Sequence, residues 1–424
     1  MVGAGWAGLA AAVCAVQAGH AVTVWEASRT LGGRARALQV ALPDGTPTWL
    51  DNGQHILIGA YTESLRLMRL VGVDPERSLL RLPFELRYPD HSGIRFAPWP
   101  APLNALAGIV CARGWSLADK AGLARHAWSW RRAGFTCPSE LSVAELCHRM
   151  PQRVMADLVE PLCVSALNTP TQSSSAQVFL RVLQDAVFGA AGGSDLLLPT
   201  VSLSALFPDA AAAWLVRNGA TVHLGARVRQ LQEDGPWRVN AQTFDRVLLA
   251  SAAPDTLHVL AQSSPNVGAH TQQAIERWLD ITRDLAYTAI TTVYAWARAA
   301  RLTQPMLALR GDPNPSQRFP AQFVFDRGQL GGPAGLLAFV VSASSAARHT
   351  MQEQVLTQAR EQLGLDMVPV KTVREQRATL ACTPGLRRPP IEIAPGLLAC
   401  ADYVQGPYPS TIEGAVRTAI AATR

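Results

Sequence analysis

The chain has 424 residues, of which 48% are hydrophobic and 17% are charged, and its formal net charge is +6. A chain of this length can bury a large core, and its composition predicts a globular protein of two domains. The cations are scattered and nearly all are arginine, with lysine only at Lys120 and Lys371, which argues against a nucleic-acid partner.

The first element is a dinucleotide-binding motif, G-x-G-x-x-G, formed by Gly3, Gly5 and Gly8. The first glycine allows a tight turn out of a strand, the second lets backbone approach a pyrophosphate, and the third lets a helix pack closely on the strand. A helix is expected over residues 9–17, and its N-terminus supplies unpaired N–H groups for the phosphates. Glu26 closes the next β run, roughly 20 residues on, where an acidic side chain accepts hydrogen bonds from a ribose.

A second glycine motif, Leu31-Gly32-Gly33-Arg34, follows this strand. Gly33 lets the chain return to the pyrophosphate, and Arg34 supplies a fixed cation there. The combination favours FAD over NAD as the cofactor. It resembles the amine oxidase and phytoene desaturase superfamily of FAD enzymes. That resemblance implies an α/β fold, with a discontinuous Rossmann-type FAD-binding domain and an α+β substrate domain that has an antiparallel sheet and a helical part.

The first strand is the incomplete part of this motif, because only Met1 and Val2 precede Gly3. A strand usually needs about five or six residues, and this one is expected at the centre of a doubly wound sheet. We therefore expect the native start to lie a few codons upstream, or the chain to be trimmed at its N-terminus.

The next informative stretch, residues 49–61, contains Asp51-Asn52-Gly53-Gln54-His55. Polar residues and glycine between apolar runs are typical of a loop that lines a cofactor. In the resembled superfamily this segment crosses near the isoalloxazine ring, which implies Gly53 as a flavin contact. Asp51 and His55 are the candidates for a catalytic proton donor or an orienting group, and a structural or surface role is the alternative for His55.

A strongly apolar segment, residues 96–112, is too short and too interrupted by proline to span a bilayer. Five cations and three tryptophans follow it between residues 113 and 132. Two interpretations stay open. The segment is either a buried helix pair of the substrate domain or an interfacial element that lies on a membrane.

The middle of the chain alternates between helical and β character. A long helix capped by residues 173–175 is expected to run to about Phe188, and another helix to end at Asn218-Gly219. Short strands are then expected over residues 221–224, 227–231, 237–241 and 246–250. By the resemblance, Val228 belongs to the strand whose backbone meets the adenine, and the last of these strands leads out of the FAD domain.

Four strand-like runs between residues 285 and 342 predict an antiparallel sheet, followed by a helix over residues 351–363. Near the end of the chain, a buried strand closes in Asp402, and a last helix opens at Ser410 with Glu413 at capping-box spacing. The resemblance implies that Asp402 contacts the ribityl or pyrophosphate part of FAD. It also implies that the first turn of the last helix, at Thr411 and Ile412, faces the N1/O2 edge of the flavin.

The chain therefore leaves the FAD domain and returns to it twice. We expect the FAD-binding domain to comprise residues 1–60, 200–255 and 375–424. The substrate-binding domain is expected to comprise residues 61–199 and 256–374.

Longer phrases carry a narrower resemblance over essentially the whole chain. They are LDNGQHILIGAY, the Leu167-Asn168-Thr169 phrase leading to FLRVLQDAVFG, residues 195–208, and ADYVQGPYPSTIEGAVR. Together they resemble the hopanoid-associated, squalene desaturase-like flavoproteins, the hydroxysqualene dehydroxylases. One departure is Ala399-Cys400-Ala401-Asp402, since many relatives have glycine before the aspartate.

That resemblance implies the reductive removal of a hydroxyl group from hydroxysqualene, giving squalene for hopanoid synthesis. The allylic hydroxyl leaves as water after protonation, and reduced FAD delivers a hydride from N5 to the resulting cation. The protein then needs to exclude water and to supply a proton donor. The expected partners are a long apolar isoprenoid substrate and an electron donor that the sequence does not identify; no metal is expected.

Two other functional classes stay open. The first is an oxidative flavoenzyme, either a carotenoid or phytoene-type desaturase or an amine oxidase. Many amine oxidases carry a lysine near flavin N5, and neither Lys120 nor Lys371 lies in a matching strand context. The second is a non-catalytic FAD-binding scaffold in a lipid-synthesis complex.

The seven cysteines form no C-x-x-C pair and most lie in apolar runs, which predicts reduced thiols in a cytoplasmic protein. No signal peptide and no transmembrane run is evident. The localisation expected is cytoplasmic, with peripheral contact on the inner face of the cytoplasmic membrane if the interfacial interpretation of residues 96–132 holds.

Overall fold

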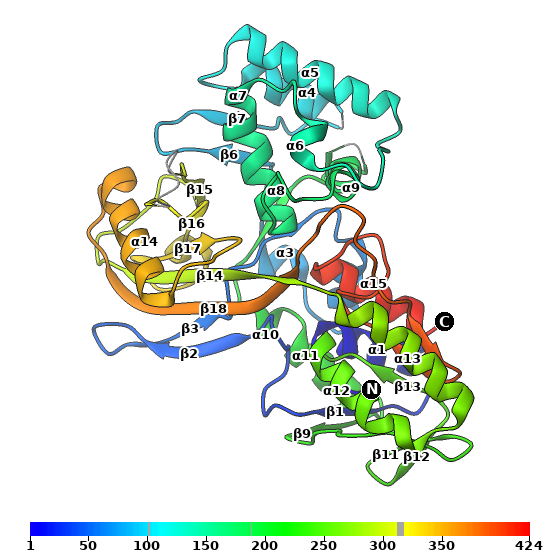
Figure 1. The fold of residues 1–424 in the computed structure, drawn as a ribbon. Coiled ribbons are helices and arrows are strands. Elements are labelled where there is room, and N and C mark those ends of the chain that lie inside the picture. The colour runs from blue at the N-terminus through cyan, green and yellow to red at the C-terminus, as the bar shows by residue number, and fades with distance from the viewer. Residues whose placement is uncertain (101, 188, 312–317) are drawn as a thin grey trace.

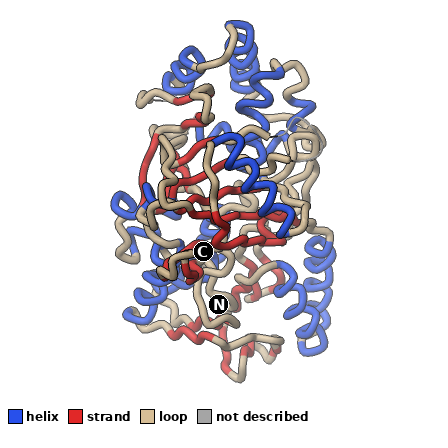
Figure 2. The backbone as a smooth tube through the Cα atoms, turned by 90° about the vertical axis from the view of Figure 1, so that its left-hand side faces the viewer, coloured by secondary structure: helices blue, strands red, loops and turns tan. Residues whose placement is uncertain are grey.

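The computed structural model describes residues 1–100, 102–187, 189–311 and 318–424. A nucleotide-binding domain forms one end of the molecule, a five-stranded sheet lies in the middle, and a helical cap forms the other end (Figure 1). Figure 2 shows the same order from the side. This architecture confirms the predicted α/β fold class with a discontinuous nucleotide domain.

The sheet of the nucleotide domain is built around the first residues of the chain. Val2 pairs in parallel with Trp25 on one side and Leu249 on the other, and Gly3 N donates to Trp25 O at 2.7 Å. The predicted first strand thus occupies the centre of the sheet, although it is reduced to a single bridging residue. The strands on one side of Val2 are β1 (Thr23–Glu26) and β9 (Thr221–Leu224). Those on the other side are β13 (Val247–Leu249), β20 (Leu397–Ala399) and β19 (Glu392–Ala394).

Helices cover one face of this sheet in a shared apolar core. The alanine-rich helix α1 (Trp6–Gln17) is buried over nearly all its length, as expected for a helix that is hydrophobic all round. It packs between α11 (Pro208–Arg217) and α15 (Ile412–Ala422).

The other face is covered by α12 (Ala253–Ser263), α13 (Ala269–Arg283) and a small antiparallel meander. The meander consists of β10 (Gln232–Glu233), β11 (Trp237–Val239) and β12 (Gln242–Phe244). Residues 227–231, predicted as a strand, form no strand and belong to no sheet.

Two elements lie elsewhere than the predicted domain boundaries imply. Helix α2 (Thr62–Leu70) buries Leu65 and Met68 in the core of the nucleotide domain. Helix α13 buries Ile275 and Trp278 against the opposite face of the same domain. Both helices are amphipathic, but their sequence alone does not reveal which domain their apolar face packs against. The exact domain boundaries stay a prediction.

The middle sheet is antiparallel in the order β15-β16-β17-β14-β18. Alternate residues of β17 face opposite sides: Leu337 and Phe339 pack against α14, while Ala338 and Val340 face the cap. Because side chains alternate between the two sides along a strand, both faces of this sheet are buried, one by α14 and the other by the cap. Its elements are β14 (Tyr287–Trp296), β15 (Met306–Ala308), β16 (Phe323–Asp326), η3 (Arg327–Leu330), β17 (Leu336–Val341), α14 (Arg348–Leu363) and β18 (Val368–Leu380).

The sequence predicts a strand over residues 377–381, which is only the end of the longest strand, β18. It pairs with β14 along almost its whole length, with register shifts at two places. Its sequence carries charged residues at many positions, because much of it lies at the edge of the sheet and is partly exposed.

The cap and the segments that join it to the nucleotide domain contain short strands and most of the remaining helices. The predicted long helix after residue 175 is α9, and its expected end at Phe188 lies outside the described residues. The strands are β2 (Ala37–Ala41), β3 (Pro47–Asp51), β4 (Leu57–Ile58), β5 (Leu79–Leu82), β6 (Glu85–Arg87), β7 (Gly93–Arg95) and β8 (Leu196–Pro199). The helices are α3 (Pro75–Ser78), α4 (Leu103–Cys111), α5 (Leu117–Arg132), α6 (Val143–Leu146), α7 (Gln152–Val154), η1 (Met155–Val159), α8 (Glu160–Leu167), α9 (Ala176–Val187) and α10 (Leu203–Leu206), with η2 (Ser264–Asn266) in the nucleotide domain.

Candidate functional site

A cavity of about 1090 Å³ begins at the glycine-rich loop of the nucleotide domain and continues under the helical cap. The end in the nucleotide domain is lined by backbone and polar groups, and the end under the cap is lined by aliphatic and aromatic side chains. Most of the residues predicted to bind a cofactor line this cavity: Gly3, Gly5, Glu26, Gly33, Arg34, Gly53, Val228, Asp402, Thr411 and Ile412.

The glycines of the N-terminal motif are required by close backbone approaches. A Cβ on Gly8 would lie 1.9 Å from Gly3 O, and Gly3 itself has a φ of +107°. A Cβ on Gly5 would instead point toward Gly33 Cα, at 3.9 Å, where both glycines line the cavity. Gly8 therefore serves helix packing, while Gly5 and Gly33 keep side chains out of the cavity.

Glu26 holds the glycine-rich loop in place. Its Oε2 accepts a hydrogen bond from Ala4 N at 2.7 Å, and its Oε1 accepts one from Ser28 N at 2.7 Å. Each carboxylate oxygen has a second lone pair, so these bonds leave acceptor capacity for a ribose hydroxyl.

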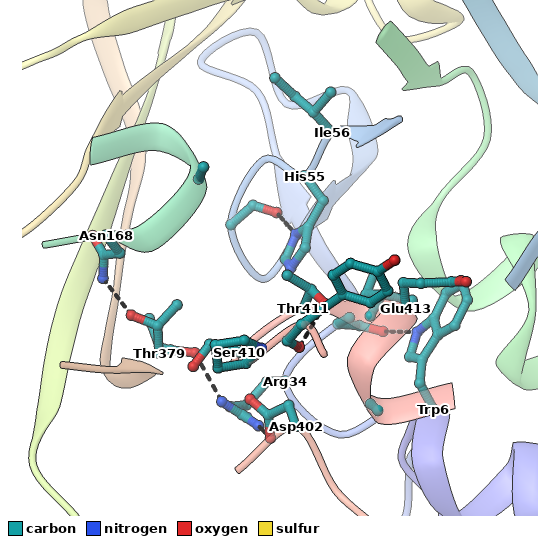
Figure 3. A pocket seen from close by; sticks show the side chains of 18 of the residues that line it. Trp6, Arg34, His55, Ile56, Asn168, Thr379, Asp402, Ser410, Thr411 and Glu413 are labelled. Atoms are coloured by element: carbon teal, nitrogen blue, oxygen red, sulfur yellow. Dashed lines mark hydrogen bonds and ion pairs between the residues drawn. The ribbon is translucent and has the colours of Figure 1, made fainter. Parts of the chain in front are cut away.

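Arg34 and Asp402 contact each other, although the sequence predicted two separate cofactor contacts. Arg34 Nη2 lies 2.5 Å from Asp402 Oδ1, and Nη1 donates to Ala378 O at 2.8 Å (Figure 3). The cation thus joins the second glycine motif to the turn after β20, where the strand predicted to close in Asp402 ends at Ala399, and to the end of β18. Both side chains line the cavity.

His55 lines the cavity, and its ring points toward the start of α15 (Figure 3). Its Nδ1 lies 2.8 Å from Gly53 O. A carbonyl only accepts, so this contact places the proton on Nδ1 and leaves a lone pair on Nε2. Burial lowers the pKa of His55 below its ordinary value. The neutral ring is therefore a hydrogen-bond acceptor toward the cavity.

Asp51, predicted as the other catalytic candidate, does not line the cavity. Its Oδ1 accepts a hydrogen bond from Leu203 N at 2.9 Å, at the first residue of α10. Its main-chain O accepts one from Tyr294 Oη at 2.9 Å. Burial raises the pKa of Asp51, while the helix start attracts its carboxylate. A catalytic role for Asp51 stays a prediction; its hydrogen bond with Leu203 N makes the side chain a link between β3 and α10.

The lowered pKa of His55 gives a pH dependence of stability. Because the folded chain disfavours the proton on this ring, the unfolded chain binds more protons below the ordinary histidine pKa of about 6.5. Stability is therefore fully present above that pH and falls as the pH decreases toward the folded pKa. We expect His55→Gln to lose less stability than the unaltered chain between neutral and mildly acidic pH, by about 1.4 kcal/mol for each unit of pKa lowering.

The measurement is urea unfolding of both proteins across this pH range. Because the charge of His55 also acts on the pKa of Asp51, the difference between the two proteins reports His55 together with this carboxyl group. Parallel pH curves would contradict the assignment of a disfavoured proton.

The start of α15 lines the cavity, as predicted, but its cap differs from the prediction. Thr411, not Ser410, is the N-cap: its Oγ1 accepts a hydrogen bond from Gly414 N at 2.9 Å. Ser410 has a φ of +58°, and its Oγ accepts from Leu380 N at 2.8 Å, at the end of β18. The side chain of Ser410 is thus turned away from the helix that it was expected to cap.

Glu413 is also not part of a capping box on its own helix. Its fully buried carboxylate accepts from Glu63 N at 3.1 Å and from Ser64 N at 2.9 Å, at the start of α2. It also accepts from Ser64 Oγ at 2.7 Å and from Arg417 Nε at 2.8 Å. Glu413 therefore fixes α2 against α15.

Replacing Glu413 with glutamine should lower the free energy of unfolding by about 2 kcal/mol. Four donors surround the carboxylate, and an amide places its own NH₂ against some of them. The estimate is below the range for fully buried pairs because the Arg417 side chain is 33% exposed.

Glu63→Gln is the matched control at the same helix start, because the partly exposed Glu63 side chain pairs with Arg66. We expect it to change the free energy of unfolding by less than about 0.5 kcal/mol. Equal urea midpoints for the two variants would contradict this role.

Under the cap the cavity is apolar. Phe84, Phe96 and Trp130 line it from the cap, and Phe323 and Phe325 line it from the middle sheet. Because aromatic side chains form its walls, this part of the cavity, which we call the apolar chamber, is suited to a hydrocarbon ligand.

Asn168, Asp185 and Tyr408 are among the polar residues of the cavity that were not predicted as site residues. Asn168 has a φ of +48°, donates to Thr379 Oγ1 at 2.9 Å and accepts from Ala343 N at 2.6 Å (Figure 3). Tyr408 Oη donates to Asp185 Oδ2 at 2.8 Å. All three lie in the phrases that carried the narrower resemblance, and that was the only signal available for them.

The two lysines lie away from the site. Lys120 Nζ donates to Val110 O at 2.6 Å on the cap, and Lys371 is exposed on β18. Neither residue is among those that line the cavity.

These residues fit a dinucleotide cofactor such as FAD. The glycine-rich loop and Gly33 provide a backbone cradle that added Cβ atoms would narrow. Glu26 retains acceptor capacity at one end, and the cavity continues past the start of α15 to His55. The predicted contacts of individual residues with FAD stay proposals.

Residues 6–424 match the family described as flavin containing amine oxidoreductase. Over 99% of its length the chain is 26% identical to a protein named hydroxysqualene dehydroxylase from Rhodopseudomonas palustris, covering 95% of that protein. It is 24% identical to the protein of the same name from Sinorhizobium fredii, again over 99% of this chain and 95% of the relative.

Solved structures give the same fold at lower identity. An oxidoreductase from Methanosarcina mazei matches 99% of this chain and 98% of its own, with a TM-score of 0.74 and 17% identity. Putrescine oxidase with bound putrescine matches 100% of this chain and 97% of its own, with a TM-score of 0.66 and 16% identity.

Proposed function

Because the chain belongs to the flavin containing amine oxidoreductases, we propose that this FAD-dependent oxidoreductase removes the hydroxyl group of hydroxysqualene reductively to give squalene. The observation that carries the proposal is the cavity, in which a dinucleotide cradle opens into an apolar chamber. The chamber favours a hydrocarbon substrate over a charged one.

Three relatives named hydroxysqualene dehydroxylase support this choice, at 23–26% identity over 99% of the chain. The placement of the two lysines outside the cavity argues against an amine oxidase of the lysine-containing type.

The cofactor is FAD, and its reduced form supplies the hydride when bound. We expect it to be held by the predicted cofactor-binding residues that line the cavity, with Gly8 supporting them through the close packing of α1 on Gly3. They are Gly3, Gly5, Glu26, Gly33, Arg34, Gly53, Val228, Asp402, Thr411 and Ile412. The hydroxyl leaves as water with one added proton, and the hydride replaces it on carbon.

His55 is expected to orient the substrate hydroxyl, not to protonate it. Its Nδ1–H is held by Gly53 O, and the lone pair on Nε2 accepts the O–H of the substrate. The lowered pKa keeps the ring neutral, so a cationic donor form is disfavoured. The apolar walls of the chamber exclude water around the reacting carbon.

A carotenoid or phytoene-type desaturase is the second candidate. The chain is 31% identical to a 15-cis-phytoene desaturase from Synechococcus elongatus, but over 26% of this chain only. Both candidates would use the apolar chamber, and they differ in whether the flavin begins reduced or oxidised.

The test is a single turnover under anaerobic conditions. Chemically reduced holoenzyme mixed with hydroxysqualene should form squalene, measured by mass spectrometry, while the flavin absorbance returns to that of the oxidised form. Desaturation of phytoene by oxidised enzyme, with hydroxysqualene unchanged by the reduced enzyme, would overturn the proposal.

Variants at position 55 test the orienting role. His55→Leu removes the acceptor and should raise KM and lower kcat, whereas His55→Gln keeps a carbonyl acceptor and should retain more activity. If His55→Leu with full FAD content turns over at the rate of the unaltered enzyme, His55 does not orient the substrate.

A further inference from the structure

Exposed apolar side chains are concentrated on the helical cap. In the described part of the chain, ten large hydrophobic side chains are exposed, and six of them lie between residues 99 and 128. We call these six side chains the cap tip; they are Trp99, Leu103, Leu106, Val110, Leu117 and Trp128. Helices α4 and α5 carry it at the end of the molecule farthest from the nucleotide domain (Figure 1).

The apolar face of α4 is fixed outward by packing on its other side. Leu103, Leu106 and Val110 are spaced by three and four residues, which puts them on one face of the helix, and they are 54%, 53% and 62% exposed. On the opposite side Gly108 is buried, and a Cβ there would lie 2.7 Å from Phe96 Cδ1. Rotation of α4 to bury its apolar face is therefore blocked.

The surroundings of this surface are basic. Between residues 95 and 135 the chain has six cations and one carboxylate, Asp119, which forms a capping box with Ser116. Arg132 lies over the Trp128 ring at 5.4 Å. Apolar side chains flanked by tryptophan and cations are typical of elements that lie in the interface of an anionic bilayer.

The same charge argues against a second copy of the chain as the occupant. A symmetric dimer through this face would bring its cations together with few carboxylates opposite them. An anionic lipid surface is complementary both to the cations and to the apolar side chains.

The inner sides of these helices line the cavity. Ala105 and Ile109 of α4 and Leu123, Ala127 and Trp130 of α5 are among its lining residues. One helical layer thus separates the exposed apolar face from the apolar chamber.

We propose that the cap tip docks on the surface of an anionic lipid bilayer and places the apolar chamber next to the hydrocarbon from which its substrate comes. The docking is independent of the reaction, and the transfer of substrate rests on the proposed function. The contact is peripheral: among the described residues, no helix has the length and hydropathy needed to cross a membrane.

The test is flotation of the full-length holoenzyme with two kinds of vesicles, phosphatidylcholine alone and an equal mixture with phosphatidylglycerol. We expect binding to the mixed vesicles that weakens with added salt. Leu103→Asp, Leu106→Asp and Val110→Asp combined should lower the partition coefficient by roughly 100-fold or more. Arg125→Glu, Arg131→Glu and Arg132→Glu combined should abolish the preference for the anionic vesicles.

The matched control is Val216→Asp, Leu224→Asp and Val368→Asp combined, since these side chains are similarly exposed, at 60%, 47% and 52%, and lie outside the cap tip. This control should bind vesicles like the unaltered enzyme. FAD absorbance and the melting temperature verify that each variant is folded.

Three results would overturn the proposal. They are no binding of the unaltered enzyme, equal binding of the α4 variant, or a dimer in sedimentation that the α4 variant converts to monomer. Turnover of detergent-dispersed hydroxysqualene is measured separately. If that turnover fails while vesicle binding follows the expected pattern, only the proposed reaction is lost.

Discussion

Arg34→Met is expected to purify largely without flavin. The substitution leaves the Asp402 carboxylate unpaired in the cavity, next to the cradle in which the anionic pyrophosphate is expected to bind. Breaking a buried ion pair costs 3–5 kcal/mol in general. Because the Arg34 side chain is 35% exposed, we expect about 3 kcal/mol, or ~100-fold in the Kd for FAD.

The companion variants separate charge from packing. Asp402→Asn keeps the cation and should weaken FAD binding by only about 10-fold. Combining it with Arg34→Met removes both charges and should recover part of the affinity that Arg34→Met alone loses. The measurement is FAD titration of the apoprotein by fluorescence. A double variant weaker than Arg34→Met would show that the pair does not act through its charges.

Gly8→Ala is expected to prevent folding of the nucleotide domain, whereas Gly5→Ala should spare the fold and weaken only cofactor binding. A Cβ on Gly8 would meet Gly3 O at 1.9 Å, and neither backbone segment can move because both belong to the core. Such overlap is expected to cost more than about 4 kcal/mol. Gly5 has a φ of −75°, which alanine adopts readily, and its new methyl group would point into the cavity.

The measurement is soluble yield and circular dichroism for both variants, followed by FAD titration of Gly5→Ala. A loss of at least 10-fold in FAD affinity with an unchanged melting temperature is expected for Gly5→Ala. A well-folded Gly8→Ala protein would contradict the packing role assigned to Gly8.

The parts of the fold that follow local rules could be predicted from the sequence. Gly3, Gly5 and Gly8 act through backbone geometry, so their spacing, together with the following helix and Glu26, predicted the nucleotide site. The four strand-like runs after residue 285 were equally evident, because their apolar residues are continuous. The edge strand β18 was missed over most of its length, because exposed charged positions conceal the alternation of a strand.

Side-chain partners across the chain could not be predicted in this way. Asp51 lies four residues from His55, yet its carboxylate binds the start of α10, which is 152 residues away in sequence. Glu413 has the spacing of a capping box on its own helix and instead binds the start of α2, 349 residues away at Ser64. In both cases the carboxylate accepts hydrogen bonds from the start of a helix that is distant in sequence and that tertiary packing brings to it.

The packing of α1 against α15 has a consequence for the order in which the protein can form. The apolar surface of α1 leaves the ribosome well before α15, which covers it and follows nearly 400 residues later in the chain. At roughly 5–20 residues per second, synthesis of the intervening segment takes about 20 to 80 s. During that time the alanine-rich helix has no native partner on that side. The nascent chain is therefore expected to depend on a chaperone that shields its N-terminal segment until residues 412–422 have emerged.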